Sequence, residues 1–203
     1  MRLLRCLLFS SAILVVSCNS NKDKGGITIK DKDGNKTTIN LKAVEEMAKA
    51  AEKTQDKAEE LKKLTPLSLD QLKAMMPEEF MGMKRSSFSA NSMMGAAFCE
   101  ARYKGDGEKE LKLSIYDCAG EAGAGIYSLR YWTLMNFQQE DDNGYQKSVD
   151  FSGQKAVEKY TKYNDEYGLT YMANDRFLVS VEGQKIGLDA VKQAANSLNL
   201  KAN

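Results

Sequence analysis

The segment Leu111-Lys112-Leu113-Ser114-Ile115-Tyr116-Asp117 alternates large apolar residues with polar or amphipathic ones. A period of two is typical of a β-strand that packs one face against a hydrophobic core. Further short β-prone segments lie on both sides of it, separated by turn-forming Gly, Asp and Asn residues. With residues 111–117, the predicted strands cover 83–90, 95–103, 145–151, 155–162, 169–173 and 176–182.

Three helices are predicted around these strands. Residues 69–76 follow the N-cap candidate Ser68, residues 126–138 carry apolar side chains every three positions, and Asp189 would cap a closing helix. Strands in consecutive hairpins, interrupted by one helix and closed by another, are typical of an α+β domain. We expect a mainly antiparallel sheet of about six or seven strands with packed helices, spanning residues 66–203.

The N-terminal half predicts a hairpin followed by a long helix. Two β-branched runs flank Asp33-Gly34, which predicts a tight hairpin over residues 27–40. Asn40 would cap a helix over 41–64 whose apolar seam is mostly alanine in the middle. Because alanine buries little area, we expect a mostly solvated stalk; the alternative is a short coiled coil.

Residues 1–17 have the pattern of a secretory signal. Arg2 and Arg5 are followed by an apolar run too short to span a membrane, and the polar segment 19–26 comes next. Leu14-Val15-Val16-Ser17-Cys18 resembles the lipobox of bacterial lipoproteins. That resemblance implies cleavage before Cys18, acyl chains such as palmitate on Cys18, a lipidated tether over 18–26, and attachment to a membrane of the cell envelope, on its periplasmic or surface side. The alternative is an ordinary signal peptide.

Composition excludes several classes of function. The chain has 203 residues with 29 basic and 28 acidic side chains, and loss of Arg2 and Arg5 would leave 27 basic ones. This balance gives no reason to expect a nucleic-acid partner. Histidine is absent, so neither a Ser-His-Asp triad nor a histidine metal site can form. No cofactor loop is recognised, and we expect no cofactor.

The globular half also resembles an uncharacterised family of exported bacterial proteins. The shared features are Pro77, Gly82 and Arg85 after a short helix, and the segment Asp175–Val181 before the closing helix. The order of elements resembles the PsbP-like arrangement, in topology only. The resemblance supports the fold and implies no activity.

Two loop features suggest chemistry. Gly120, Gly123 and Gly125 follow a strand and precede the predicted helix at Ile126, which is where anion-binding loops occur. Their spacing matches neither dinucleotide nor P-loop patterns, so a flexible connection is the alternative. Asp117 and Glu121 are the nearest pair of carboxylates for a hydrolase, or else ordinary polar residues at element ends.

Methionine clusters in one segment. Six of the ten methionines are Met75, Met76, Met81, Met83, Met93 and Met94. With Cys99 they are candidates for a Cu(I) site, for an apolar groove that carries a small ligand, or for simple core filling. Cys99 and Cys118 would point to opposite sides of one hairpin, which disfavours a disulfide but leaves their pairing open.

The C-terminal half is rich in tyrosine. Its members are Tyr145, Tyr160, Tyr163, Tyr167 and Tyr171, interleaved with lysines. They indicate either a carbohydrate platform or half-buried sheet tyrosines. Taken together, the sequence favours a lipid-anchored, non-catalytic binding or scaffolding module that recruits an envelope protein through the stalk seam or a sheet edge. The alternatives are the carrier of a small apolar ligand or Cu(I), and a hydrolase based on Asp or Glu.

Overall fold

The computed structural model describes residues 26–30, 36–93, 95–128 and 137–200. It divides into two compact units, residues 1–49 and 50–203. In the first unit, β1 (Gly26–Lys30) and β2 (Lys36–Asn40) pair antiparallel over the residues where the sequence predicts a hairpin. Helix α1 (Leu41–Lys62) begins in the first unit and ends in the second.

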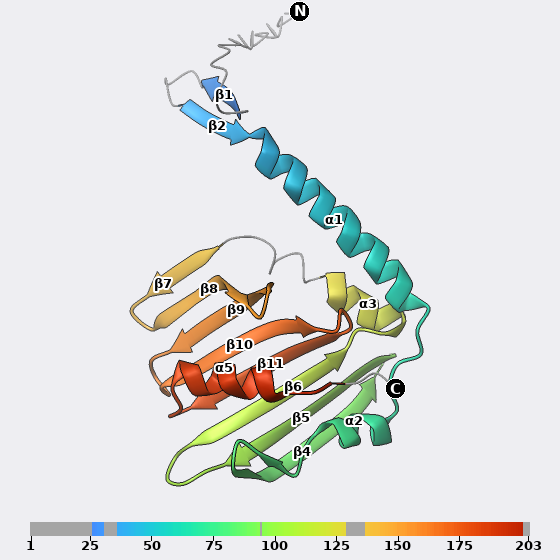
Figure 1. Cartoon of the computed structure of the whole chain (residues 1–203), viewed down its shortest axis with the longest axis vertical. Coiled ribbons are helices and arrows are strands. Elements are labelled where there is room, and N and C mark those ends of the chain that lie inside the picture. The colour runs from blue at the N-terminus through green and yellow to red at the C-terminus, as the bar shows by residue number, and fades with distance from the viewer. Residues whose placement is uncertain (1–25, 31–35, 94, 129–136, 201–203) are drawn as a thin grey trace, which may run out of the picture. The chain divides into compact units, whose positions relative to one another are not determined.

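Within the described residues, the second unit is built on one antiparallel sheet of nine strands (Figure 1). Their order across the sheet is β3-β4-β5-β6-β11-β10-β9-β8-β7. The strands are β3 (Glu79–Phe80), β4 (Met83–Met93), β5 (Ala96–Lys104), β6 (Glu110–Asp117), β7 (Gln138–Asp141), β8 (Gly144–Phe151), β9 (Gln154–Thr161), β10 (Glu166–Ala173) and β11 (Phe177–Gln184).

The predicted α+β architecture with an antiparallel sheet is therefore confirmed, but the strand count of six or seven is too low. The sequence missed the two outermost strands. β3 has only two residues, and all four residues of β7 are polar and exposed. Neither strand shows the apolar alternation that reveals a strand with one buried face.

The alternating segment 111–117 lies at the centre of the sheet as β6, between β5 and β11. Ile115 lies opposite Cys99 on one side and Val179 on the other, and all three are fully buried. The alternation thus marks a strand whose apolar residues all meet one core.

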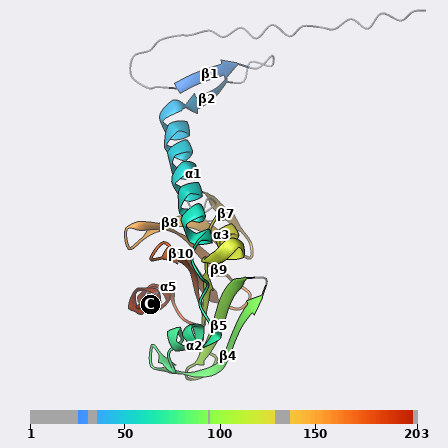
Figure 2. The same cartoon turned by 90° about the vertical axis from the view of Figure 1, so that its right-hand side faces the viewer.

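Two hydrophobic cores cover the two faces of the sheet. The α5-side core contains Leu72 of α2 (Leu69–Met75) and Val191 of α5 (Leu188–Ser197) against residues such as Val179. Figure 2 shows α2 and α5 on the same side of the sheet. The α3-side core packs Ala124 and Tyr127 of α3 (Gly120–Ser128) against the opposite face.

The helix ends only partly follow the predictions. At α2, Ser68 is the N-cap: its hydroxyl accepts from the Gln71 amide, and the Gln71 side chain accepts from the Ser68 amide. The prediction that Asp189 caps the last helix is wrong, since Gly187 is the N-cap of α5 and Asp189 lies in its first turn. A carboxylate there still interacts favourably with the helix dipole.

The prediction of a helix over 126–138 is confirmed at residues 126–128 and wrong at both of its ends, while residues 129–136 lie outside the described residues. α3 begins six residues earlier, at Gly120, and Gln138 already belongs to β7. The glycines expected to form a flexible link are part of the helix itself. Close packing of α3 on the sheet therefore overrides the low helix propensity of glycine.

The second half of α1 is not a solvated stalk. Ala58 and Leu61 are buried in the α3-side core, and Thr54 is buried as well. Val44 and Ala48 of the first half are exposed. The prediction of a solvated helix therefore fails from about Thr54 onward, because this part of the alanine seam meets α3 and the sheet.

Cys99 and Cys118 are both free and buried. Cys99 belongs to the α5-side core and Cys118 to the α3-side core. The prediction that their side chains point to opposite sides of the sheet is confirmed.

Candidate functional site

The methionine segment lies mostly in the core. Met76 is buried, and Met75, Met81 and Met83 pack partly buried against the same α5-side core as Cys99. Of Met93 only the backbone position is described, and Met94 lies outside the described residues. Burial raises the pKa of the Cys99 thiol to about 12, so this thiol stays protonated at neutral pH when no metal ion is bound.

The structure does not bring Met83 and Cys99 together. The Met83 sulfur lies about 3.1 Å from the position that a Cβ would occupy on Gly105. Gly105 follows Cys99 by six residues at the end of the same strand, which corresponds to roughly 20 Å at about 3.3 Å per residue. Met75, Met76, Met81 and Met83 pack in or against the α5-side core, where flexible thioethers commonly fill irregular space.

The three glycines have different environments in α3. Gly120 has a left-handed φ of 78°, which favours glycine. A Cβ on Gly123 would lie 2.6 Å from the carbonyl carbon of Cys118, whereas a Cβ on Gly125 would meet nothing within 4 Å. Gly123 thus lets α3 approach the end of β6, and Gly125 lies on the open side of the helix.

Asp117 is a structural anchor. Its carboxylate accepts from Nε and one terminal nitrogen of Arg176, at 2.7 and 2.8 Å, and from the amides of Leu67 and Ala119, at 2.8 and 3.1 Å. Asp117 is fully buried. Its four bonds join the segment before α2, the end of β6 and the turn before β11, whereas Glu121 is exposed and makes none of these contacts.

Arg85 and Arg176 belong to the two motifs on which the resemblance to exported bacterial proteins rests. Both donate hydrogen bonds to backbone carbonyls. Arg85 donates to the carbonyl of Met76 at 2.8 Å, and Arg176 donates to that of Thr65 at 3.2 Å. Both contacts fasten the segments around α2 to the sheet. These two arginines therefore have a role in packing.

The tyrosines do not form one platform. Tyr145, Tyr160 and Tyr167 form a row across β8, β9 and β10, with ring centroids 5.9 and 4.5 Å apart. Tyr171 is buried in the α5-side core, and Tyr163 is 98% exposed. Neighbouring rings of the row are tilted against one another by 36° and 31°, and the Lys147 ammonium lies 4.7 Å from the Tyr145 centroid. Much of the ring surface is therefore already in contact.

Glu158 lies beside this row as a buried carboxylate. It accepts from the Tyr145 hydroxyl at 2.9 Å and pairs with Lys147 and Lys192, at 3.2 and 2.8 Å. Burial alone would raise the pKa of Glu158, but the bonds from Lys192, Tyr145 and Lys147 outweigh it and hold the pKa below its ordinary value. Because Lys192 belongs to α5, this cluster ties that helix to the sheet.

Glu158→Gln is expected to lower the free energy of unfolding at pH 7 by about 1 kcal/mol, because the charge-assisted bonds are lost. Because the pKa of Glu158 in the folded state lies below the unfolded value near 4.5, its carboxylate stabilises the folded protein at pH values above 4.5. This stabilisation is lost as the pH falls through the folded-state pKa. Urea unfolding at several pH values should show the two proteins converging below pH 4.5. Glu78→Gln, at a carboxylate 94% exposed, serves as the control; an equal effect of both changes would contradict the prediction.

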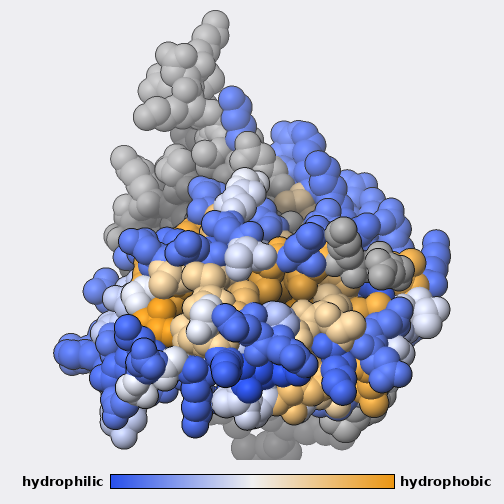
Figure 3. Space-filling view, turned by 60° about the horizontal axis from the view of Figure 1, so that its bottom comes forward, coloured by the Kyte–Doolittle hydropathy of each residue, from blue (hydrophilic) through white to orange (hydrophobic). Residues whose placement is uncertain are grey.

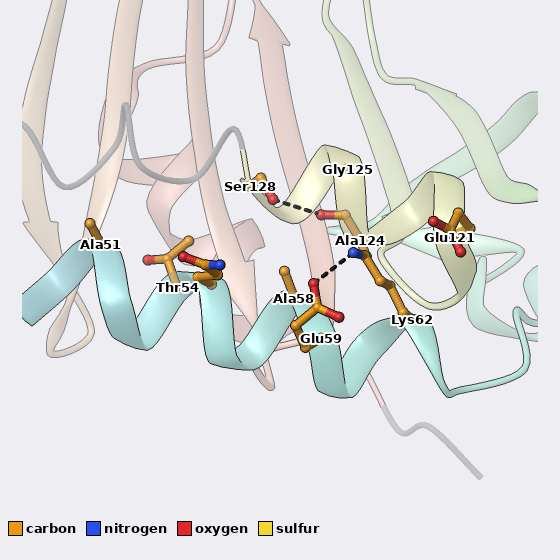
Figure 4. A pocket seen from close by; sticks show the side chains of 10 residues that line it. Ala51, Thr54, Ala58, Glu59, Lys62, Glu121, Ala124, Gly125 and Ser128 are labelled. Carbon is orange, nitrogen blue, oxygen red and sulfur yellow. Dashed lines mark hydrogen bonds and ion pairs between the residues drawn. The ribbon is translucent and has the colours of Figure 1, made fainter.

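A groove of about 480 Å³ is lined by residues of the second half of α1 and of α3, beside the place where the two helices pack together (Figure 4). Small residues line its floor, among them Ala51, Ala58 and Ala124, while Glu59 and Lys62 form an ion pair of 2.6 Å at its rim. No three His, Cys, Asp or Glu side chains gather here or elsewhere in the described ranges as a metal ion would require. Nothing in the lining selects a particular ligand.

β4 forms one edge of the sheet, and most of this edge is unpaired within the described residues. Its inner side pairs with β5 along its length, whereas β3 pairs with it only at Met83 and Lys84. One further bond joins the Arg85 amide to the Glu78 carbonyl at 2.9 Å. From Ser86 to Met93 the outward backbone groups meet no other described strand, so they can accept an added strand.

The opposite edge of the sheet is protected. β7 is only four residues long, and it ends in the exposed acidic residues Glu140 and Asp141. Short edge strands and charges are common means of preventing edge-to-edge association. Residues 86–93 have no charged side chain and no proline, and a β-bulge protects only their beginning, at Ser86.

The open edge has apolar neighbours. Phe88 and Ala90 of β4 are half-buried against the α5-side core, and Leu69 of the adjacent α2 is 50% exposed. Seen from the lower end of Figure 1, where α2 and β4 lie, apolar surface runs between hydrophilic residues (Figure 3). An added strand would therefore gain backbone hydrogen bonds and also contacts with apolar side chains.

No family model matches the chain, and neither the curated proteins nor the solved structures with which it was compared give a match. Among the helices of the described residues, none combines the length and the apolar character needed to cross a membrane.

Proposed function

We propose that the protein is an exported lipoprotein whose globular unit is a non-catalytic binding module, and that this module recruits a protein of the cell envelope by strand addition to β4. The unpaired, uncharged stretch Ser86–Met93 carries the proposal. Backbone pairing at such an edge supplies affinity, and side-chain contacts on the two faces supply selectivity. The lipid on Cys18 would keep the module at the membrane where its partner resides.

Strand addition to the open edge of β4 is tested by photo-crosslinking in intact cells. A photoreactive residue at Asn91, exposed on β4, is expected to give one adduct of defined mass, and the same residue at Gln139, exposed on β7, is expected to give none. Ser87→Lys combined with Ser89→Lys should abolish the adduct, because charges on an edge strand oppose pairing. Absence of an adduct at Asn91, or equal adducts at both edges, would refute recruitment through β4.

The predicted lipid anchor on Cys18 is tested separately by labelling cells with a palmitate analogue. Cys18→Ala is expected to lose the label and to leave the membrane fraction, while Cys6→Ala, within the predicted signal, keeps both. Label retained in Cys18→Ala would reject the lipidation and leave the strand-addition test unaffected.

A further inference from the structure

A hollow of about 230 Å³ lies at the C-terminal end of α5. Four segments far apart in the sequence form it: the turn between β8 and β9, the end of β10, the turn after it, and residues 195–200. The two turns have left-handed first residues, Ser152 with a φ of 49° and Asn174 with a φ of 53°. Ser152-Gly153 is a two-residue hairpin turn, whereas Asn174 opens a three-residue turn between Ala173 and Phe177. Left-handed φ values are common in such turns, and asparagine tolerates them better than most residues.

The lining of the hollow is uncharged, although 28% of the chain is charged. Its polar side-chain groups are the amides of Gln154, Asn174, Asn196 and Asn199 and the hydroxyls of Ser152 and Tyr171. Each amide offers both hydrogen-bond donors and acceptors. A charged ligand would lose hydration here without gaining a counter-charge, whereas a neutral polar ligand can replace its water contacts one by one.

Part of this hydrogen-bonding capacity is unused. The Ser152 hydroxyl donates to Oδ1 of Asn196 at 2.6 Å, and Nδ2 of Asn174 donates to the carbonyl of Leu200. These bonds orient the two amides and leave Nδ2 of Asn196 and Oδ1 of Asn174 available. Among the described residues, the side chains of Gln154 and Asn199 have no hydrogen-bond partner.

Two aromatic rings give the hollow a firm apolar wall. Phe151 and Tyr171 meet edge to face with centroids 5.1 Å apart, and the Tyr171 hydroxyl donates to the carbonyl of Ala195 at 3.0 Å. Both residues are 6% exposed. Their positions are therefore set before any ligand arrives, which reduces the entropy lost on binding.

We propose that this hollow binds a neutral, polyhydroxylated ring, such as one residue of a glycan. Its volume is below the usual range of about 300–1,000 Å³ for drug-sized ligands, which fits a single ring. Amides that both donate and accept suit adjacent hydroxyl groups, and the aromatic wall suits the apolar C–H groups of a sugar. The proposal does not depend on strand addition at β4, which lies at the far edge of the sheet order.

The test uses the full-length chain in a detergent without a sugar headgroup. Saturation-transfer NMR is recorded with the methyl glycosides of glucose, galactose and N-acetylglucosamine, and with glucuronate as the charged analogue. At least one neutral glycoside should bind, and glucuronate should bind at least about tenfold more weakly. Binding of none of the neutral glycosides, or equal binding of glucuronate, would overturn the proposal.

Variants locate the binding. Asn196→Asp places a charge in the hollow with almost no change of shape and is expected to weaken binding at least about tenfold. Asn199→Leu removes an exposed amide and should weaken binding without affecting the fold. Asn143→Asp, in the exposed turn between β7 and β8, is the matched control and should bind like the parent. Unchanged binding in Asn199→Leu and in folded Asn196→Asp would reject the site.

Discussion

Arg176→Met is expected to lower the free energy of unfolding by about 3–5 kcal/mol, the usual cost of removing one partner of a buried ion pair. The fully buried Asp117 carboxylate would lose its cationic partner and retain only the amides of Leu67 and Ala119 as donors. The change would also release the carbonyl of Thr65, which Arg176 binds. Urea unfolding followed by circular dichroism measures the loss.

Arg102→Met is the matched control. Arg102 also pairs with a carboxylate at 2.7 Å, that of Glu110, but its side chain is 45% exposed. The expected loss is below about 1 kcal/mol, because solvent-exposed ion pairs contribute little. Equal losses in the two variants would show that burial does not decide the strength of the Asp117 anchor.

Gly123→Ala and Gly125→Ala are expected to have opposite effects although they lie in one helix. At Gly123 the new methyl group would lie within 3.0 Å of three backbone atoms of residues 117 and 118, so α3 would have to move. Such overpacking costs about 1–3 kcal/mol. At Gly125 nothing lies within 4 Å, and alanine should stabilise the helix by up to about 1 kcal/mol.

Thermal unfolding of the two variants tests this packing. A lower melting temperature for Gly123→Ala together with a higher one for Gly125→Ala is the expected result. If both variants were neutral, α3 would not be held against the end of β6, and the alternative of a flexible glycine connection would return.

Some of the proposed binding surfaces were visible in the sequence and some were not. The strand at 83–90 was predicted from the sequence. Its position near the edge of the sheet follows only from the order of all nine strands, in which β3 and β7 are outermost. The tyrosine-rich half was recognised, yet three of its rings form a row, one is buried and one is exposed. Strand alternation tells which face a residue is on and not which strand lies beside it.

The sequence by itself determined the elements whose signals are local. Alternation defined the central strands, Ser68 as an N-cap residue defined the start of α2, and strand parity placed Cys99 and Cys118 on opposite faces. Each of these signals comes from neighbouring residues that share one environment, so a short window of sequence contains the whole cause.

Only the tertiary structure decided the start of α3, the burial of the second half of α1, the Asp117–Arg176 anchor and the amide-lined hollow. Asp117 and Arg176 are 59 residues apart, and the hollow combines four separate segments. Their causes are close packing and the need of buried polar groups for partners, which act between segments that the chain brings together only when the sheet has formed.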